Sequence, residues 1–143
     1  MGRSGAEYIP DEIRDQATAL GYSGVNTYTE ALGLNERRLY KFFQQTHKRL
    51  RPYYNLANFC GCTLDELLLI IESGKLTEYI ERIKNELGID SIMAFERMAE
   101  VGPGFIRSLL RGKISATSFN NWNEVAVSLD WTLHKLAKTA LKQ

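Results

Sequence analysis

The sequence predicts an all-α protein made of two tandem five-helix units packed together. Apolar residues recur at intervals of three and four positions, as at Leu39, Phe42 and Phe43, which is typical of helices with one buried face. Alternating apolar and polar positions, which would indicate strands, are almost absent. Capping residues and helix breakers divide the chain into short segments, and its two halves can be laid over one another.

Local signals place five helices in the first half. Pro10 suits the start of a helix, Asn35 suits an N-cap, and Pro52 fits the first turn of a fourth helix. Thr63 and Glu66 have the spacing of a capping box, in which each side chain accepts from the other residue's backbone N–H. The expected helices span residues 10–20, 25–32, 35–45, 51–60 and 63–72.

The second half repeats this arrangement. Leu20 and Gly21 fall on Leu87 and Gly88 at an offset of 67 residues, and after a two-residue slip the offset becomes 69. A fixed offset between matching segments indicates duplication of one structural unit. The expected helices of this half span residues 76–87, 91–100, 103–111, 117–129 and 131–141.

This reading divides the chain into a tail at residues 1–9, a first unit at 10–73 and a second unit at 74–143. The connection at residues 73–75 is too short for independent motion of the two units. The last helix of the first copy reads LDELLLII and is apolar around most of its circumference, so a single small core cannot bury all of it. We expect it to pack between the two units or, alternatively, in a homodimer interface.

The composition is that of a soluble globular protein. Of 143 residues, 44% are apolar and 10% aromatic, which is enough for a buried core. A net charge of +1 excludes a bulk field that would attract a polyanion, so such a signal has to come from local clusters. There is no leader segment, the longest apolar run is only Leu67–Ile71, and Cys60 and Cys62 lie one residue apart. We therefore expect a cytoplasmic protein with reduced thiols and no membrane partner.

Two motifs recur in both halves. In the first half they read LGLNERRLYKFFQ from Leu32 and LANFCGCTLDELL from Leu56. In the second half they read EVGPGFIRSLLRGK from Glu100 and VAVSLDWTLHKL from Val125. The pattern resembles the Cro and phage-repressor helix-turn-helix family of the xenobiotic-response-element type, over nearly the whole chain. The resemblance implies tandem five-helix repressor-like helix-turn-helix units, of which the second is degenerate.

The resemblance also implies where DNA would be read. A recognition helix places long polar side chains from its N-terminal part in the major groove. The base-reading candidates on the outward arc of this helix are Glu36, Arg37, Tyr40 and Lys41. Arg37 could bridge the two acceptors of a guanine, and Glu36 could accept from a cytosine. The alternative is that these residues are ordinary solvated charges.

A cluster of cations overlaps and follows this helix. Between Arg37 and Arg51 the chain has six Lys or Arg residues and no acidic residue, whereas a solvated face normally mixes signs. In the family that the chain resembles, the loop after the recognition helix runs along the phosphate backbone. The phosphate-binding candidates are Asn35, Arg38, Thr46, His47, Lys48, Arg49 and Arg51. The alternative is a loop whose charges only aid solubility.

The second copy lacks a comparable reading surface. Glu100 replaces the turn glycine, and the helix begins GPGF from Gly102, whose small or apolar side chains cannot hydrogen-bond to bases. We therefore expect the second copy to be a packing or dimerisation unit. The alternative is weak non-specific contact with the DNA backbone, which Arg107, Arg111 and Lys113 could make.

Catalytic and metal sites are not expected. Cys60, Cys62, His47 and His134 are the right residue types for zinc, but their spacing resembles no structural zinc site. The chain has no nucleophile motif and no phosphate-cradling glycine loop. We expect no enzyme activity, no cofactor and no small-molecule ligand.

The expected function is that of a sequence-specific double-stranded DNA-binding transcriptional regulator, by default a repressor. One small reading surface rarely gives enough affinity alone, so a homodimer on a two-fold operator is expected. The main alternative is a protein–protein interaction module, or an antitoxin-like partner, that exposes LLLII or Phe43 to another protein.

Overall fold

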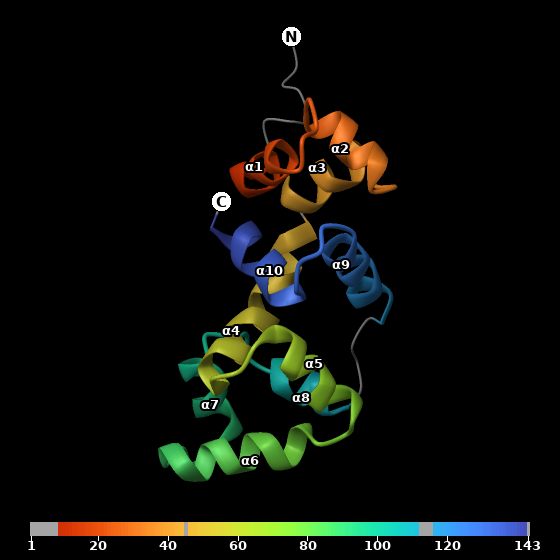
Figure 1. The fold of residues 1–143 in the computed structure, drawn as a ribbon. Coiled ribbons are helices and arrows are strands. Elements are labelled where there is room, and N and C mark those ends of the chain that lie inside the picture. Colours follow the sequence, from red (N-terminus) through yellow and green to blue (C-terminus); the bar gives the residue numbers. More distant parts are fainter. Residues whose placement is uncertain (1–8, 45, 112–115, 143) are drawn as a thin grey trace. The chain divides into compact units, whose positions relative to one another are not determined.

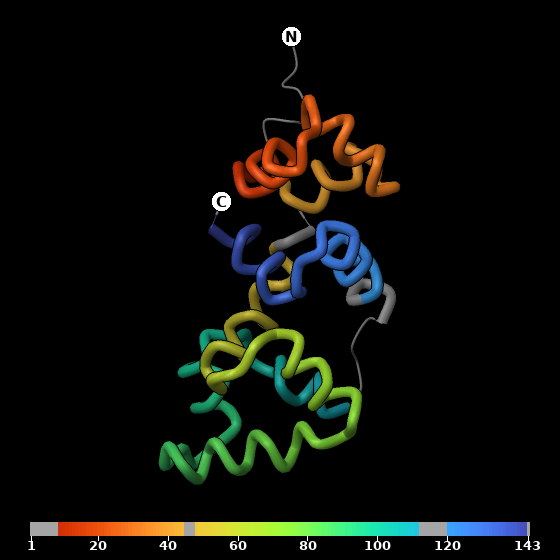
Figure 2. Tube along the Cα trace, in the orientation of Figure 1, coloured from red at the N-terminus to blue at the C-terminus, as the bar shows by residue number. Residues whose placement is uncertain are grey.

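The computed structural model describes residues 9–44, 46–111 and 116–142, and over these residues it consists of helices joined by turns and loops, without strands (Figures 1 and 2). The all-α prediction is therefore confirmed. The side chains of Thr46, His47 and residues 116–119 lie outside the described part. None of the helices in the described ranges has the length and apolar character needed to cross a membrane.

The helices follow the expected order with small shifts at their ends. The first six are α1 (Asp11–Ala19), α2 (Val25–Ala31), α3 (Glu36–Gln44), the 3-10 helix η2 (Thr46–Leu50), α4 (Arg51–Cys60) and α5 (Leu64–Glu72). The remaining five are α6 (Leu76–Leu87), α7 (Ile92–Met98), α8 (Phe105–Leu110), α9 (Ala116–Ser128) and α10 (Leu133–Leu141). Helix α8 is shorter than the expected 103–111, because Gly104 before it has a left-handed backbone with φ of 84°.

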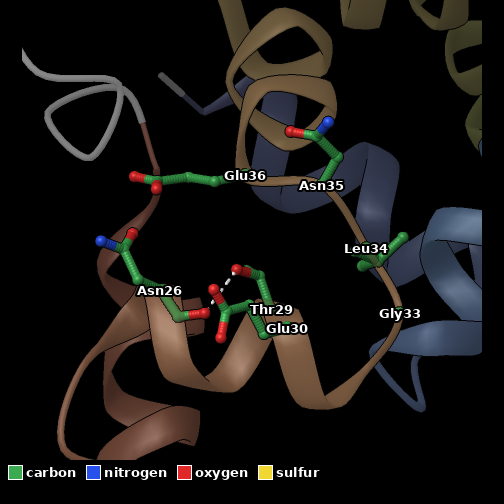
Figure 3. A pocket seen from close by; sticks show the side chains of 7 residues that line it. All are labelled: Asn26, Thr29, Glu30, Gly33, Leu34, Asn35 and Glu36. Carbon is green, nitrogen blue, oxygen red and sulfur yellow. Dashed lines mark hydrogen bonds between the residues drawn. The ribbon is translucent and has the colours of Figure 1, made fainter.

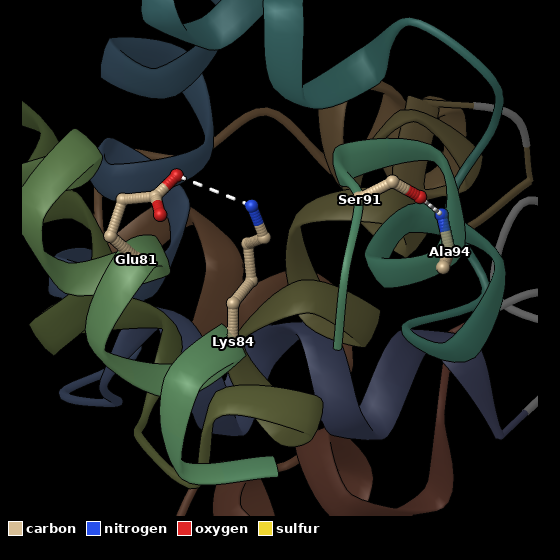
Figure 4. A network of polar contacts seen from close by, with 4 residues as sticks. All are labelled: Glu81, Lys84, Ser91 and Ala94. Atoms are coloured by element: carbon tan, nitrogen blue, oxygen red, sulfur yellow. Dashed lines mark hydrogen bonds and ion pairs between the residues drawn. The ribbon is translucent and has the colours of Figure 1, made fainter. Parts of the chain in front are cut away.

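Side-chain caps fix several helix starts, because the first N–H groups of a helix have no partner inside it. The predicted capping box is confirmed: Thr63 Oγ1 accepts from Glu66 N at 3.1 Å, and Glu66 Oε1 accepts from Thr63 N at 3.0 Å. Ser91 Oγ accepts from Ala94 N at 3.1 Å at the start of α7, as Figure 4 shows. The same figure shows the Lys84–Glu81 ion pair of α6, at 3.4 Å.

The chain forms two compact units that differ from the predicted ones. The first, here called the split unit, comprises the described residues of Met1–Leu50 and Asn120–Gln143. The second, here called the inserted unit, is the continuous segment Arg51–Phe119. This partition replaces the expected units at 10–73 and 74–143. Helices α4 and α5 belong with α6–α8, while α9 and α10 belong with α1–α3.

The split unit is closed by contacts between α1 and the turn that joins α9 to α10. Gln16 Nε2 donates to the carbonyl of Leu129 at 2.8 Å and also to the hydroxyl of Tyr28. Trp131 Nε1 donates to Gln16 Oε1 at 2.7 Å. Large apolar side chains from the five α-helices, and from the turn after α9, form the buried core, namely Ile13, Tyr28, Leu39, Phe42, Phe43, Trp122, Leu129 and Leu136.

The inserted unit has its own core and its own closing contact. The rings of Phe59 and Phe95 meet edge to face, with centroids 5.1 Å apart. Tyr79 on α6 donates its hydroxyl to the carbonyl of Cys60 at 3.3 Å. The buried apolar side chains include Leu56, Leu64, Leu67, Ile80, Ile83, Phe95, Ile106 and Leu109. Within LDELLLII the burial is uneven, because Leu69 is 66% exposed.

The same backbone turns occur in both units. Residues with positive φ recur 67 or 69 positions apart along the chain, in the pairs Gly21 and Gly88, Gly33 and Glu100, and Gly61 and Asp130. Backbone hydrogen bonds recur with them: Leu34 N donates to the carbonyl of Thr29, and Val101 N donates to that of Glu96. The offsets are those at which the two halves of the sequence align.

Candidate nucleic-acid interface

The split unit contains a helix-turn-helix formed by α2, residues 32–35 and α3. Gly33 takes a left-handed conformation with φ of 74°, which a residue without Cβ adopts at little cost. The turn is tied to α2 because Leu34 N donates to the carbonyl of Thr29 at 2.9 Å. Asn35 Oδ1 accepts from Arg37 N at 2.8 Å and caps the start of α3, as predicted. The position of α3 relative to α2 is thus fixed locally.

Helix α3 has one buried and one exposed face. Leu39, Phe42 and Phe43 are buried and anchor it in the core. Arg37 and Lys41 are exposed and lie one helical turn apart, so they share a face. Tyr40, another base-reading candidate, is half-buried. The structure therefore presents two of the predicted base-reading cations together on the outside of the unit.

Glu36 lies at the mouth of a polar notch between α2 and α3 (Figure 3). The side chain of Asn26 lies opposite it, and with the amide turned to donate, the nitrogen is 2.9 Å from Glu36 Oε1. A carboxylate in the first turn of a helix also interacts favourably with the helix dipole. The notch is lined by Asn26, Thr29, Glu30, Gly33, Leu34, Asn35 and Glu36. Asn26 thereby orients the Glu36 carboxylate from the side of α2.

Arg38, a predicted phosphate contact, is already engaged. Its Nη2 lies 2.6 Å from Glu124 Oε2 on α9, so an acidic partner comes from a residue 86 positions later. Both side chains are well exposed, and an exposed pair of this kind contributes only about 0–1 kcal/mol to stability. A phosphate at Arg38 would have to share the guanidinium with Glu124 or displace it.

The cations after α3 follow the chain from one unit to the other. Lys48 and Arg49 are exposed on η2, at the end of the first segment of the split unit. Arg51 is also exposed but is the first residue of α4 in the inserted unit. Thr46 and His47 were predicted to assist with phosphate, and their side chains lie outside the described residues.

The inserted unit has a corresponding helix-turn-helix, formed by α7, residues 99–104 and α8. Glu100 occupies the position of the turn glycine with φ of 60°, and its carbonyl accepts from Asn55 Nδ2 at 2.9 Å. Glu96 is only 3% exposed, and its Oε2 accepts from Ile106 N at 2.9 Å in the first turn of α8. A buried carboxylate therefore occupies the helix start that an incoming anion would otherwise approach.

The notch of the inserted unit is more apolar than that of the split unit. It is lined by Met93, Glu96, Arg97, Val101 and Pro103. Met93, which is 61% exposed, stands 67 positions after Asn26. Arg107 and Arg111, predicted as weak backbone contacts, are exposed, whereas Lys113 lies outside the described residues. At the offset of 67 residues, Gly104 and Ser108 stand where the split unit has Arg37 and Lys41.

The two cysteines are half-buried and not disulfide-bonded. Burial, together with the neighbouring Cys62, raises the pKa of the Cys60 thiol to about 12. The pKa of Cys62 is also raised, chiefly by burial, so both thiols are protonated at neutral pH. Among residues 9–44, 46–111 and 116–142, no three His, Cys, Asp or Glu side chains are grouped so that they could hold a metal ion.

Sequence reasoning did not identify several residues of this surface. Glu124 and Asn121 on α9 lie beside α3 in space but 80 or more positions after Arg38 and Lys41 in the chain. No local pattern could have paired them with Arg38 and Lys41.

No family model, no curated protein and no solved structure matches the chain.

Proposed function

We propose that this protein binds double-stranded DNA through the helix-turn-helix of the split unit and acts as a transcriptional regulator, by default a repressor. The observation that carries the proposal is the division of α3 into two faces. Leu39 and its buried neighbours hold the helix in the core, while Arg37 and Lys41 project together from the exposed side. A helix held in this way can enter a major groove.

The exposed face offers chemistry suited to bases. Arg37 can donate to O6 and N7 of a guanine, which is the commonest specific contact in DNA recognition. Glu36, oriented by Asn26, can accept from the amino group of a cytosine. Lys41 lies one turn further along α3 and extends the reading surface. We therefore infer a preference for sites that contain G·C pairs.

The exposed cations Lys48 and Arg49 supply phosphate contacts in this proposal, and Arg51 adds a third from the adjoining helix. Each contact with a phosphate releases a counterion, so log affinity falls by about 0.9 per log unit of salt for each one. Binding is therefore expected to weaken steeply with ionic strength. The protein's net charge of +1 makes this local effect easy to separate from bulk attraction.

The inserted unit is proposed to support binding without reading bases. Its α8 carries no long polar pair at its start, and Glu96 already occupies the helix N-terminus. Two chains are proposed to pair on a two-fold operator, with half-sites about 34–36 Å apart. The inserted unit is the proposed dimerisation element.

Selection from random duplexes, followed by fluorescence anisotropy in a salt series, tests this function. Arg37→Ala is expected to cost about 1–3 kcal/mol and to relax preference at one base position. Lys48→Ala should weaken all duplexes alike and lower the salt slope by about 1. Arg82→Ala is a matched control, because Arg82 is an exposed cation of the inserted unit. Absence of duplex binding by the parent protein at low salt would refute the proposal.

The second candidate function is a protein-interaction module. The apolar notch of the inserted unit, with Met93 largely exposed, favours it. Phe43 does not, because it is only 3% exposed and cannot serve as the contact that the sequence suggested. Met93→Gln would leave DNA binding unchanged under the first function and would abolish partner binding under the second.

A further inference from the structure

A second notch in the split unit lies between α3 and α9. It has a volume of about 270 Å³ and is lined by Arg38, Lys41, Phe42, Asn121, Trp122 and Val125. The lining residues fall at helical spacing on both elements, so two facing surfaces enclose the space. This notch is distinct from the polar one between α2 and α3, with which it shares no lining residue.

The notch has an apolar floor and a cationic rim. Phe42, Trp122 and Val125 are buried and form the floor. Lys41 and Asn121 are exposed at the rim, so an ammonium and an amide are both available as donors. Sites for small molecules commonly combine such an apolar lining with a few convergent polar groups.

Charge at the rim selects the kind of ligand. Arg38 is paired with the carboxylate of Glu124 at 2.6 Å, which offsets the charge of its guanidinium. Lys41 therefore carries the positive charge that a ligand would meet next to the apolar floor. A ligand that satisfies both features has an apolar ring or chain and a single acidic group. A neutral apolar molecule would leave the rim unused, and a small inorganic anion would leave the floor unused.

We propose that the notch between α3 and α9 binds a small carboxylate with an apolar body, with its acidic group on Lys41 and Asn121. Such binding would regulate the protein, an inference that rests on the proposed function. Lys41 belongs to both the notch and the exposed face of α3, so a bound carboxylate competes with DNA for the same ammonium. The ligand and DNA then compete for the protein, and by thermodynamic linkage each lowers the protein's affinity for the other by the same factor.

The binding test uses 1-naphthoate as the probe and neutral 1-naphthamide as its matched control, in the absence of DNA. Two-dimensional NMR of the ¹⁵N-labelled full chain should show shifts at residues 38–42 and 121–125. Because a hydrogen bond to a charged group is lost, naphthamide should bind about tenfold or more weakly. Equal affinity for the two probes, or shifts located elsewhere, would overturn the proposal.

Two variants distinguish naphthoate binding in the notch from an effect of the protein's overall charge. Lys41→Gln should weaken naphthoate binding about tenfold, whereas Lys48→Gln removes the same charge from η2, outside the notch, and should leave it unchanged. Both lysines are exposed, so both variants are expected to fold, which circular dichroism checks. Equal weakening by the two variants would show that naphthoate responds to overall charge and would refute the site.

The regulatory part is measured separately with a fluorescent duplex. Naphthoate at saturation should reduce duplex affinity of the parent protein and leave that of Lys41→Gln unaffected. Naphthoate that binds the notch without changing duplex affinity would overturn the competition. A protein that binds no duplex but binds naphthoate at residues 38–42 and 121–125 would disprove the proposed function and support the ligand site.

Discussion

The indole N–H of Trp131 donates to Gln16 Oε1 at 2.7 Å, and so joins two residues that are 115 positions apart in the chain. Gln16 in turn donates to the carbonyl of Leu129, so one side chain binds both sides of the turn between α9 and α10. In the inserted unit, the corresponding carbonyl of Cys60 is bound by Tyr79 instead. Each unit therefore has its own closing contact: α1 meets the turn between α9 and α10 in the split unit, and α6 meets the end of α4 in the inserted unit.

Gln16→Leu is expected to destabilise the split unit. The indole of Trp131 and the carbonyl of Leu129 would both lose their partner in a half-buried setting, at a cost of about 1–3 kcal/mol. Urea unfolding followed by tryptophan fluorescence measures this, since both tryptophans lie in the split unit. Thr18→Leu on the exposed side of α1 is the control. An unchanged unfolding midpoint for Gln16→Leu would contradict the closing role.

The segment Arg51–Phe119 is expected to fold by itself, because it is continuous and contains all five helices of the inserted unit. The segment 10–73, which the sequence repeat suggests as a unit, is expected to be largely unstructured. It contains α1–α3 without α9 and α10, and therefore lacks the partners of Gln16. Circular dichroism and amide dispersion in NMR distinguish the two peptides. A well-dispersed spectrum from 10–73 would argue against the observed partition.

Glu100→Gly is expected to stabilise the inserted unit by about 1 kcal/mol. Glu100 has φ of 60°, a left-handed conformation that costs a residue with Cβ roughly 1–2 kcal/mol. The reciprocal change Gly33→Ala should destabilise the split unit by a similar amount, and steric contact is not the reason, since a Cβ at Gly33 would meet no atom within 4 Å. Thermal unfolding of both variants measures the two effects. Effects of the same sign would contradict the strain argument.

Glu124→Gln is expected to increase DNA affinity, given the proposed function. The change removes the carboxylate that lies 2.6 Å from Arg38, and leaves that guanidinium available to a phosphate. The salt slope should steepen by about 0.9 if one phosphate contact is gained. Stability should change little, because the pair is exposed. Glu78→Gln, an exposed carboxylate on α6, is the control for net charge. Equal gains from both variants would attribute the effect to net charge alone.

The thiol of Cys60 is expected to react slowly at pH 8, because burial raises its pKa to about 12. The raised pKa means that the folded protein keeps a proton that the unfolded chain releases from about pH 9 upward. The stability that the protonated Cys60 thiol contributes to the folded protein is therefore fully present below pH 9 and decreases as the pH rises toward 12. Iodoacetamide labelling in buffer and in urea compares the two states. Equal labelling rates at pH 8 would show that the thiol is not protected.

Local features of the fold could be predicted because their causes lie within one turn of the chain. The capping box at Thr63 and Glu66, and the exposed pair Arg37 and Lys41, follow from spacing alone. Which helices form each unit could not be predicted. The repeat indicates which helix of the first half corresponds to which helix of the second half, but not which of the two copies completes each unit. That choice depends on contacts such as the one between Gln16 and Trp131. For the same reason Glu124 was not identified beside Arg38.

The insertion of one unit within the other has a consequence for synthesis. Translation produces α1–α3 before the inserted unit, but the helices that complete their unit, α9 and α10, are made only after it. The inserted unit is entirely translated before them and can fold as the chain leaves the ribosome, where domains generally fold as units. The apolar face of α3, with Leu39, Phe42 and Phe43, is therefore not fully covered until α9 and α10 have been made. The nascent chain is expected to need chaperone protection during that interval, and α3, which carries the proposed DNA-reading surface, becomes fixed only when the split unit closes.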